Sequence, residues 1–137
     1  QFLDRHPARI NGDGKYIRDY VYGPDVAAAN LSALSLAEQN FGEKKKLRLN
    51  IGTGIGTDVN TLEKILRTKI EQLLAQAGKK PSLPDPTYGP ERVGDLRSNL
   101  LDANRASVVL AWKPKHSLDE GLEATARWFF EKKSFAQ

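Results

Sequence analysis

The chain has 137 residues, a formal net charge of +4 and no cysteine, and its length fits one domain or a large part of one. The lack of cysteine excludes disulfides and thiolate metal sites, and with only two histidines, which have no ligand spacing, we expect no metal site. No apolar run approaches the ~20 residues that cross a bilayer, and no signal peptide is visible, so we expect a cytoplasmic protein without membrane contact.

The first forty residues predict a turn, a strand and a helix. In "INGDGKYIRDYVY" the residues at 11–14 suit a tight reversal, because two glycines flank an aspartate there. The aromatic and β-branched residues at 17–22 favour a strand. Pro24 then opens a helix, since its missing N–H would lack a partner at the first helical position anyway, and Gly42 is the predicted end.

The rest of the chain alternates in a similar way. "KLRLNIG" predicts a strand at 47–51, and the apolar spacing after it predicts a helix at 58–77. The segment at 81–95 is too rich in proline for a central strand, so we expect it to be irregular or at a sheet edge. A short helix is predicted at 103–111. The alternation of helix and strand indicates the α/β or α+β class.

The last helix is predicted to begin at Ser117. Glu120 follows three residues later, which is the pattern of a capping box. The residues expected on its inner face share a helical spacing, and they are Leu118, Leu122, Thr125, Ala126 and Phe129.

The string "LNIGTGIGTDVNTL" at 49–62 resembles a phosphate-binding loop at first sight. A dinucleotide fingerprint needs G-x-G-x-x-G, but Thr57 stands at the third glycine site, and no second strand follows with an acidic residue for a ribose. A P-loop needs a lysine that does not follow Gly56. We therefore interpret the string as a tight turn into a helix, with Thr57 or Asp58 as the N-cap, and predict no cofactor-binding residue.

Neither the positive charge nor the polar side chains near the last helix indicate a further activity. The basic runs at 43–48 and 78–80 lie where helices should end, where lysine complements the macrodipole, so we expect no nucleic-acid binding. No G-x-S-x-G elbow is present. Ser117 is interpreted as a helix cap and His116 as a surface residue rather than a general base.

Arginines beside turns are the remaining candidates for a binding site. Arg18 follows the turn at 11–14, and Arg92 lies in the proline-rich segment. A guanidinium makes planar, bidentate contacts with phosphate oxygens, and Asp95 can accept a hydrogen bond from a sugar hydroxyl. Each arginine taken alone is more often part of a surface ion pair, so residue chemistry leaves both interpretations open.

Three motifs, in order, resemble one family across nearly the whole chain. They are "INGDGKYIRDYVYGPDVAAAN", "LNIGTGIGTDVNTL" and "ERVGDLRSNLLDANRASVVLAWKPKHSLDEGLEATARWF". They are similar to the G-D-G-x-x-x-R-D-[FY]-V-Y, N-I-G-T-G and R-x-G-D … L-x-W-x-P … L-x-E-G-L segments of the extended short-chain dehydrogenase/reductases. These are the NAD-dependent nucleotide-sugar epimerases and dehydratases. The resemblance covers only their C-terminal, substrate-binding portion, and a chain that starts at Gln1 and lacks Met suggests a fragment or a processed chain.

The resemblance implies an α/β fold over residues 1–137, with a small mixed sheet, about four helices and no Rossmann half. It also implies that 47–77 complete the edge of the missing Rossmann sheet. In the family, that N-terminal half binds NAD, whose nicotinamide takes a hydride from the sugar C4, and supplies a Tyr-x-x-x-Lys pair. No tyrosine of this chain has lysine four residues later, so we expect no catalytic residue here and no activity of the chain alone. The full-length protein is expected to be a homodimer.

The resemblance also implies a site for a UDP-sugar. In this sequence Arg18 and Arg92 would bind the diphosphate, and Asp95 would contact the ribose. The residues expected along the uracil, partly through backbone groups, are Arg9, Ile10 and Asn11.

Some positions depart from the family pattern. Asn11 stands where the family often has an aromatic residue, Pro24 replaces an aspartate, and Asn99 occupies a place where some epimerases have tyrosine. The nucleotide and the sugar therefore stay open. The alternatives are a dehydratase or decarboxylase of the same family, or a non-catalytic domain that binds nucleotide-sugars.

Overall fold

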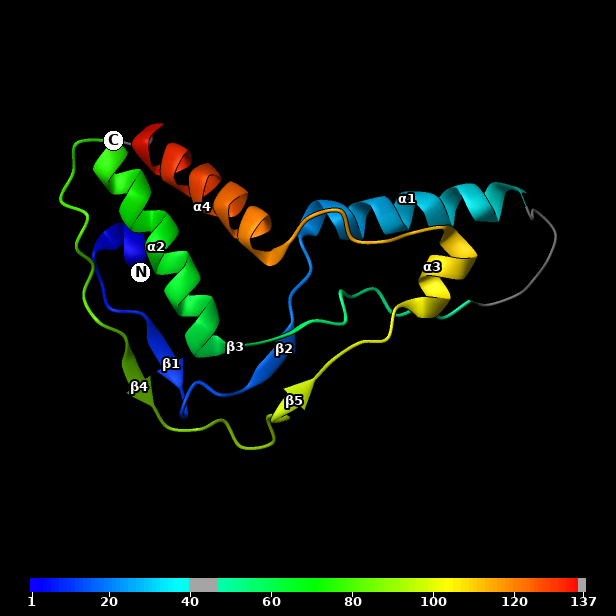
Figure 1. The fold of residues 1–137 in the computed structure, drawn as a ribbon, viewed down its shortest axis with the longest axis horizontal. Helices are drawn as coiled ribbons and strands as arrows, with labels where there is room; N and C mark the ends of the chain where they lie inside the picture. The colour runs from blue at the N-terminus through cyan, green and yellow to red at the C-terminus, as the bar shows by residue number, and fades with distance from the viewer. Residues whose placement is uncertain (40–46, 136–137) are drawn as a thin grey trace.

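The computed structural model describes residues 1–39 and 47–135, which contain four α-helices and five short strands (Figure 1). The helices are α1 (Gly23–Gln39), α2 (Val59–Gln76), α3 (Asn104–Leu110) and α4 (Leu118–Phe135), preceded by a 3-10 turn, η1 (Phe2–Asp4). The strands are β1 (Arg9–Asn11), β2 (Ile17–Asp19), β3 (Gly56–Asp58), β4 (Thr87–Gly89) and β5 (Ser98–Asn99).

The strands form two small sheets. In the first, β1 pairs in parallel with β4, so that Ile10 lies opposite Tyr88. In the second, β2 lies between β3, to which it is antiparallel, and β5, to which it is parallel. The second sheet is therefore mixed, which confirms the α/β class with small mixed sheets and about four helices.

The hydrophobic core is divided into two clusters. The first lies among η1, α2 and α4, and its buried members are Phe2, Ile70, Leu73, Leu74, Leu83 and Ala126. The second lies between α1 and α3, and its buried members are Ala29, Ala106 and Trp112. Figure 1 shows α2 and α4 at the left of the molecule and α1 and α3 at the right, with β2, β3 and β5 toward the middle, so the two clusters lie apart.

The predicted helix starts are confirmed where local side chains determine them. Asp58 is the N-cap of α2, and its carboxylate accepts hydrogen bonds from the backbone N–H and the hydroxyl of Thr61 at 2.9 and 2.7 Å. Ser117 and Glu120 form the predicted capping box, since the Ser117 N–H donates to Glu120 at 2.8 Å and the Glu120 N–H donates to Ser117 at 3.3 Å. The predicted end of α1 at Gly42 lies outside the described residues.

Two predictions about the fold are wrong. Residues 47–51 form no strand, because a strand needs a paired neighbour and no other described segment pairs with them. Phe129 is 54% exposed and does not line the inner face of α4, where Phe130 packs against the first cluster instead. Positions three and four residues after the buried Ala126 both lie near its face of the helix, so spacing alone does not decide between Phe129 and Phe130.

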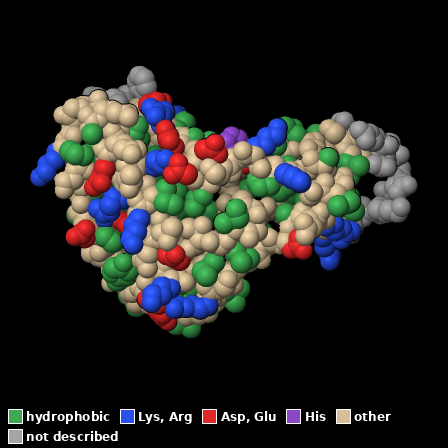
Figure 2. Space-filling view, in the orientation of Figure 1, with side chains coloured by type: hydrophobic (Ala, Val, Ile, Leu, Met, Phe, Trp, Pro, Cys, Tyr) green, Lys and Arg blue, Asp and Glu red, His purple; other side chains and the backbone are tan. Residues whose placement is uncertain are grey.

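The molecule exposes more surface than its mass predicts. Its accessible surface is 9637 Å², whereas a compact monomer of this mass exposes about 7,100 Å². Large apolar side chains contribute to the excess, among them Leu31 on α1, 66% exposed, and Val108 on α3, 84% exposed. Figure 2 shows hydrophobic side chains at the surface over both parts of the molecule.

None of the helices described is both long and apolar enough to span a bilayer.

Candidate functional site

The turn between β1 and β2 is held in place by the start of α2. Gly12 and Gly14 both have positive φ, 66° and 70°, a backbone conformation that glycine adopts without strain. The side-chain amide of Asn60 donates to the carbonyl of Asp13 at 2.9 Å, and the Asn60 N–H donates to the carbonyl of Gly14 at 3.1 Å. Tyr88 on β4 also donates to Asn60 at 3.0 Å. The turn is therefore fixed between a helix and the first sheet.

Arg18 extends from β2 to the segment that precedes β5. Its Nη1 donates to the carbonyl of Leu96 at 2.7 Å and to that of Ile17 at 2.8 Å. Its Nη2 lies 3.4 Å from Oδ1 of Asp95. The structure thus brings together Arg18 and Asp95, two predicted site residues that stand far apart in the sequence.

Arg92 belongs to the same turn as Asp95. The Asp95 N–H donates to the carbonyl of Arg92 at 3.2 Å, and Gly94 between them has a φ of 86°. Among the described residues, no hydrogen bond or ion pair engages the Arg92 side chain, which is exposed. Arg92 therefore has no partner among the described residues, and it belongs to the turn that Arg18 contacts through Asp95.

The three residues predicted along the base lie in β1. Ile10 is only 3% exposed, so its side chain belongs to the interior and only its backbone can meet a ligand. The Arg9 side chain lies over Gly89 of β4, where a Cβ atom would meet its Nε at 3.0 Å. Asn11 ends β1, and the following residue, Gly12, lies next to Glu91 in the loop between β4 and β5. The residues predicted along the uracil therefore border the same loop that carries Arg92 and Asp95.

Sequence reasoning missed an ion pair beside this loop. Arg97 donates to both carboxylate oxygens of Asp13, at 2.9 and 2.7 Å, and its guanidinium lies 4.7 Å from the ring centroid of Tyr16. These hydrogen bonds lower the pKa of Asp13 to about 2 and raise the pKa of Arg97. In Figure 2, basic and acidic side chains lie together at the lower edge, where Figure 1 draws the loop between β4 and β5. No sequence pattern pairs these residues.

The glycine-rich string forms a turn whose donors are already occupied. The carboxylate of Asp19 accepts from the Thr53 N–H at 2.8 Å, the Thr53 hydroxyl at 2.6 Å and the Gly54 N–H at 2.9 Å. A Cβ atom at Gly52 would lie 2.6 Å from Asp19, which explains the glycine. Burial raises the pKa of Asp19, but these donors, together with the Leu101 N–H, outweigh that effect and lower the pKa.

The occupied turn does not fit NAD. A dinucleotide phosphate would need the N–H groups that Asp19 already binds, and the carboxylate of Asp19 would repel it. The residues present here therefore provide no place for that cofactor. Within the described residues no group of three acidic or histidine side chains is placed to hold a metal ion.

His116 and Ser117 have structural partners. The carboxylate of Asp25, only 2% exposed, accepts from the N–H groups of Lys115 and His116 at 3.1 and 3.0 Å, and lies 3.0 Å from Nδ1 of His116. Burial raises the pKa of Asp25, but these hydrogen bonds outweigh it and lower the pKa. The carbonyl of Asp25 also accepts from Nε1 of Trp112 at 2.8 Å. Asp25 therefore ties the start of α1 to the segment before α4.

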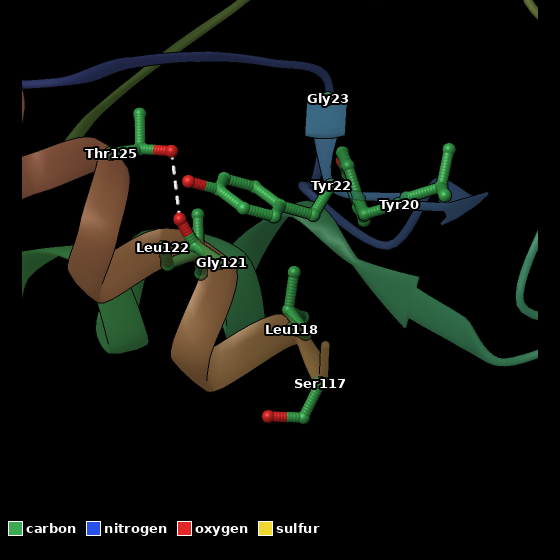
Figure 3. A pocket seen from close by; sticks show the side chains of 9 residues that line it. Tyr20, Tyr22, Gly23, Ser117, Leu118, Gly121, Leu122 and Thr125 are labelled. Atoms are coloured by element: carbon green, nitrogen blue, oxygen red, sulfur yellow. Dashed lines mark hydrogen bonds between the residues drawn. The ribbon is translucent and has the colours of Figure 1, made fainter. Parts of the chain in front are cut away.

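A cavity of about 160 Å³ lies where β2, α1 and α4 meet (Figure 3). Tyr22 lies across Gly121, where a Cβ atom would meet its ring at 3.1 Å, and the hydroxyl of Thr125 donates to the carbonyl of Gly121 at 2.7 Å. The hydroxyl of Ser117 is engaged in the capping box. The cavity thus gathers no acid, base or cation, and the arginines near β2 and β5 are the better candidate site.

Comparisons with known proteins place these features in a family context. No family model matches the chain. It is 36% identical over 124 residues to UDP-glucose 4-epimerase of Mycolicibacterium smegmatis, which covers 90% of this chain and 34% of that protein. It is 24% identical over 135 residues to dTDP-glucose 4,6-dehydratase of Xanthomonas campestris, covering 98% of this chain and 37% of that protein.

Solved structures agree with these relatives. UDP-glucose 4-epimerase of Thermotoga maritima, solved with UDP-glucose, superposes with a TM-score of 0.73 and 39% identity over 96% of this chain and 37% of that one. MoeE5, solved with UDP-glucuronic acid and NAD, superposes with a TM-score of 0.72 and 31% identity, over 95% of this chain and 38% of that one. The chain spans about a third of the length of these proteins. These matches confirm the family resemblance: over about 90% of its length the chain is homologous to part of the UDP-glucose 4-epimerases and related NAD-dependent epimerases and dehydratases.

Proposed function

We propose that this chain is the UDP-sugar-binding portion of an NAD-dependent UDP-glucose 4-epimerase that interconverts UDP-glucose and UDP-galactose in galactose metabolism. The observation that carries the proposal is the meeting of Arg18 with the turn that holds Arg92 and Asp95. A diphosphate is a compact dianion, and guanidinium groups bind it through charge-assisted hydrogen bonds.

The residues of this chain would bind and orient the substrate. Arg18 is preorganised, because two carbonyls and Asp95 already hold its guanidinium, whereas Arg92 is available to close on a bound phosphate. Asp95, released from part of its contact with Arg18, can accept from a ribose hydroxyl. Backbone groups of β1 would lie along the uracil, with Arg9 and Asn11 beside it. Binding energy from the nucleotide would thus hold the sugar in place, at a distance from the reacting carbon.

The remaining chemistry belongs to the part of the protein that would bind NAD. NAD would supply hydride exchange at the sugar C4, and no residue described here has a role in that step. We propose that residues 47–77 complete the edge of the sheet in that part. This is supported by the unpaired segment at 47–51 and by the excess of exposed surface. The isolated chain would be inactive, and the full-length protein would be a cytoplasmic homodimer.

Calorimetric titration of UDP into the full-length protein tests the binding site. Arg18→Ala and Arg92→Ala should each raise Kd by about tenfold, equivalent to ~1.4 kcal/mol. Arg127→Ala is the matched control, because Arg127 makes an exposed ion pair on α4, with Glu123 at 3.4 Å, and should leave Kd unchanged. If neither of the first two substitutions weakens binding, the assignment of these arginines is wrong.

An assay for epimerisation of UDP-galactose tests the activity. The full-length protein should convert it to UDP-glucose, and the isolated chain should not. A dehydratase is the second candidate, favoured by the relative that acts as a dTDP-glucose 4,6-dehydratase. Formation of a 4-keto-6-deoxy sugar from dTDP-glucose, without epimerisation of UDP-galactose, would support that alternative and contradict the proposal.

A further inference from the structure

The ion pair between Arg97 and Asp13 joins two segments that carry the candidate site. Asp13 lies in the turn between β1 and β2, and Arg97 is the residue before β5. Both nitrogens Nη1 and Nη2 of Arg97 donate to Asp13, one to each carboxylate oxygen. Such a two-point contact fixes both distance and orientation, unlike most exposed pairs, which contribute little.

Tyr16 adds a second contact to the same pair. Its ring, 9% exposed, lies between the two segments, with the guanidinium of Arg97 at 4.7 Å from the centroid and that of Arg18 at 5.9 Å. The backbone continues the connection, because the Ile17 N–H donates to the carbonyl of Arg97 at 2.9 Å. Arg97 therefore contacts the β1–β2 region in three ways: an ion pair with Asp13, stacking of its guanidinium on Tyr16, and a backbone hydrogen bond with Ile17.

The two segments differ in how firmly they are held. The turn that carries Asp13 is bound to Asn60, close to the start of α2, through two hydrogen bonds. The segment at 90–96 contains no helix and no strand, and its side chains are mostly exposed. At the start of the segment, the Gly12 N–H of the β1–β2 turn donates to the carbonyl of Gly89 at 3.0 Å. At its end, the Arg97 pair attaches it to the same turn through side chains, with Glu91 also 3.7 Å from Arg97.

We propose that Arg97 is a positioning residue for nucleotide binding, which holds the segment at 92–96 against Arg18 by its two-point contact with Asp13 and its stacking on Tyr16. The inference rests on the proposed function, because it gives Arg92 and Asp95 their roles. Without the Arg97 side chain, the segment keeps its backbone contacts but loses the two hydrogen bonds that tie its end to Asp13. A diphosphate then has to order the loop as it binds, which weakens affinity without changing the reaction itself.

Substitutions in the full-length protein test this role. Arg97→Ala and Asp13→Asn should each raise the Kd of UDP and the KM of UDP-galactose by about threefold to tenfold, with kcat within twofold of wild type. Arg97→Lys keeps the charge but has no planar fork, so its Kd should lie between those of wild type and Arg97→Ala. Arg127→Ala, which removes an exposed pair on α4, should leave Kd and KM unchanged.

A double-mutant cycle separates positioning from a general loss of structure. In an Arg92→Ala background, Arg97→Ala should raise Kd less than twofold further, because the segment that Arg97 positions no longer carries its phosphate-binding side chain. If the two penalties multiply, Arg97 acts independently of Arg92 and the inference is overturned. It is also overturned if Arg97→Ala binds UDP like wild type, or if Arg97→Lys is as weak as Arg97→Ala.

The same measurements distinguish the two levels of failure. If Arg18→Ala and Arg92→Ala weaken UDP binding and Arg97→Ala does not, only the role of Arg97 is wrong. If the full-length protein does not bind UDP, or if the Arg18 and Arg92 variants bind like wild type, the proposed function fails and the positioning role fails with it.

Discussion

Replacing Asp19 by asparagine should loosen the glycine-rich turn without changing the shape of the side chain. The carboxylate accepts from two N–H groups and one hydroxyl of residues 53–54 within 2.9 Å, and more weakly from the Leu101 N–H at 3.4 Å. An asparagine keeps one acceptor oxygen and turns an NH₂ group toward the remaining donors. Two of the donors then lose their acceptor.

The magnitude follows from the number of hydrogen bonds lost. A hydrogen bond to a charged group contributes ~1.5–3 kcal/mol when buried, and this site is partly exposed, so each lost bond should cost about 1–2 kcal/mol. Two lost bonds give a destabilisation of about 2–4 kcal/mol. Asp102→Asn is the matched control, because the one hydrogen bond that Asp102 accepts from the described residues is local, from the Asn104 N–H at 2.8 Å. It should cost about 0.5 kcal/mol.

Two measurements on the full-length protein check this prediction. Urea unfolding should give a lower unfolding free energy for Asp19→Asn, and hydrogen–deuterium exchange should be faster in the peptide that covers residues 52–55. The control should change neither by a comparable amount. Equal exchange in that peptide for wild type and Asp19→Asn would show that the carboxylate does not hold the turn, and the argument would be refuted.

Three further predictions concern other contacts. Gly14→Ala should destabilise by about 2–4 kcal/mol in urea unfolding, because φ is positive and the new Cβ would press on Asn60, and an unchanged midpoint would contradict this. Trp112→Phe should cost about 2 kcal/mol, since it removes the bond to Asp25 and leaves a small cavity, and a cost near zero in the same assay would show that the bond is dispensable. The pKa values of Asp19 and Asp25 are lowered in the fold, so the unfolded chain binds more protons below pH ~4; their stabilisation is complete above that pH and is lost as the pH falls through the folded values. Unfolding from pH 6 to pH 2.5 should therefore show a steep loss of stability that is shallower in Asp19→Asn, and parallel curves would contradict the role of Asp19.

Local patterns predicted the helices well, because a helix is built from contacts within a few residues. The N-cap of α2 at Asp58 and the capping box of α4 at Ser117 both lie where the sequence places them. The segment at 47–51 alternates apolar and polar residues but forms no strand in this structure. Such alternation indicates which side chains would share a face of a sheet, and it does not show whether a neighbouring strand is present to pair with. The side chain of Phe129 shows the same limit on a helix, where spacing leaves more than one position near the buried face.

The sequence by itself determined the helices, the turn at the glycine-rich string and the family resemblance, since these depend on short-range spacing and on residue types in order. Only the tertiary structure decided which distant side chains meet. Asp13 and Arg97 stand 84 positions apart, and Asp19 stands 34 positions from Thr53, yet each pair is in hydrogen-bond contact. Such contacts arise when loops are brought together by packing elsewhere in the molecule. No local pattern in the chain indicates them, and for that reason the ion pair between Arg97 and Asp13 could be found only in the tertiary structure.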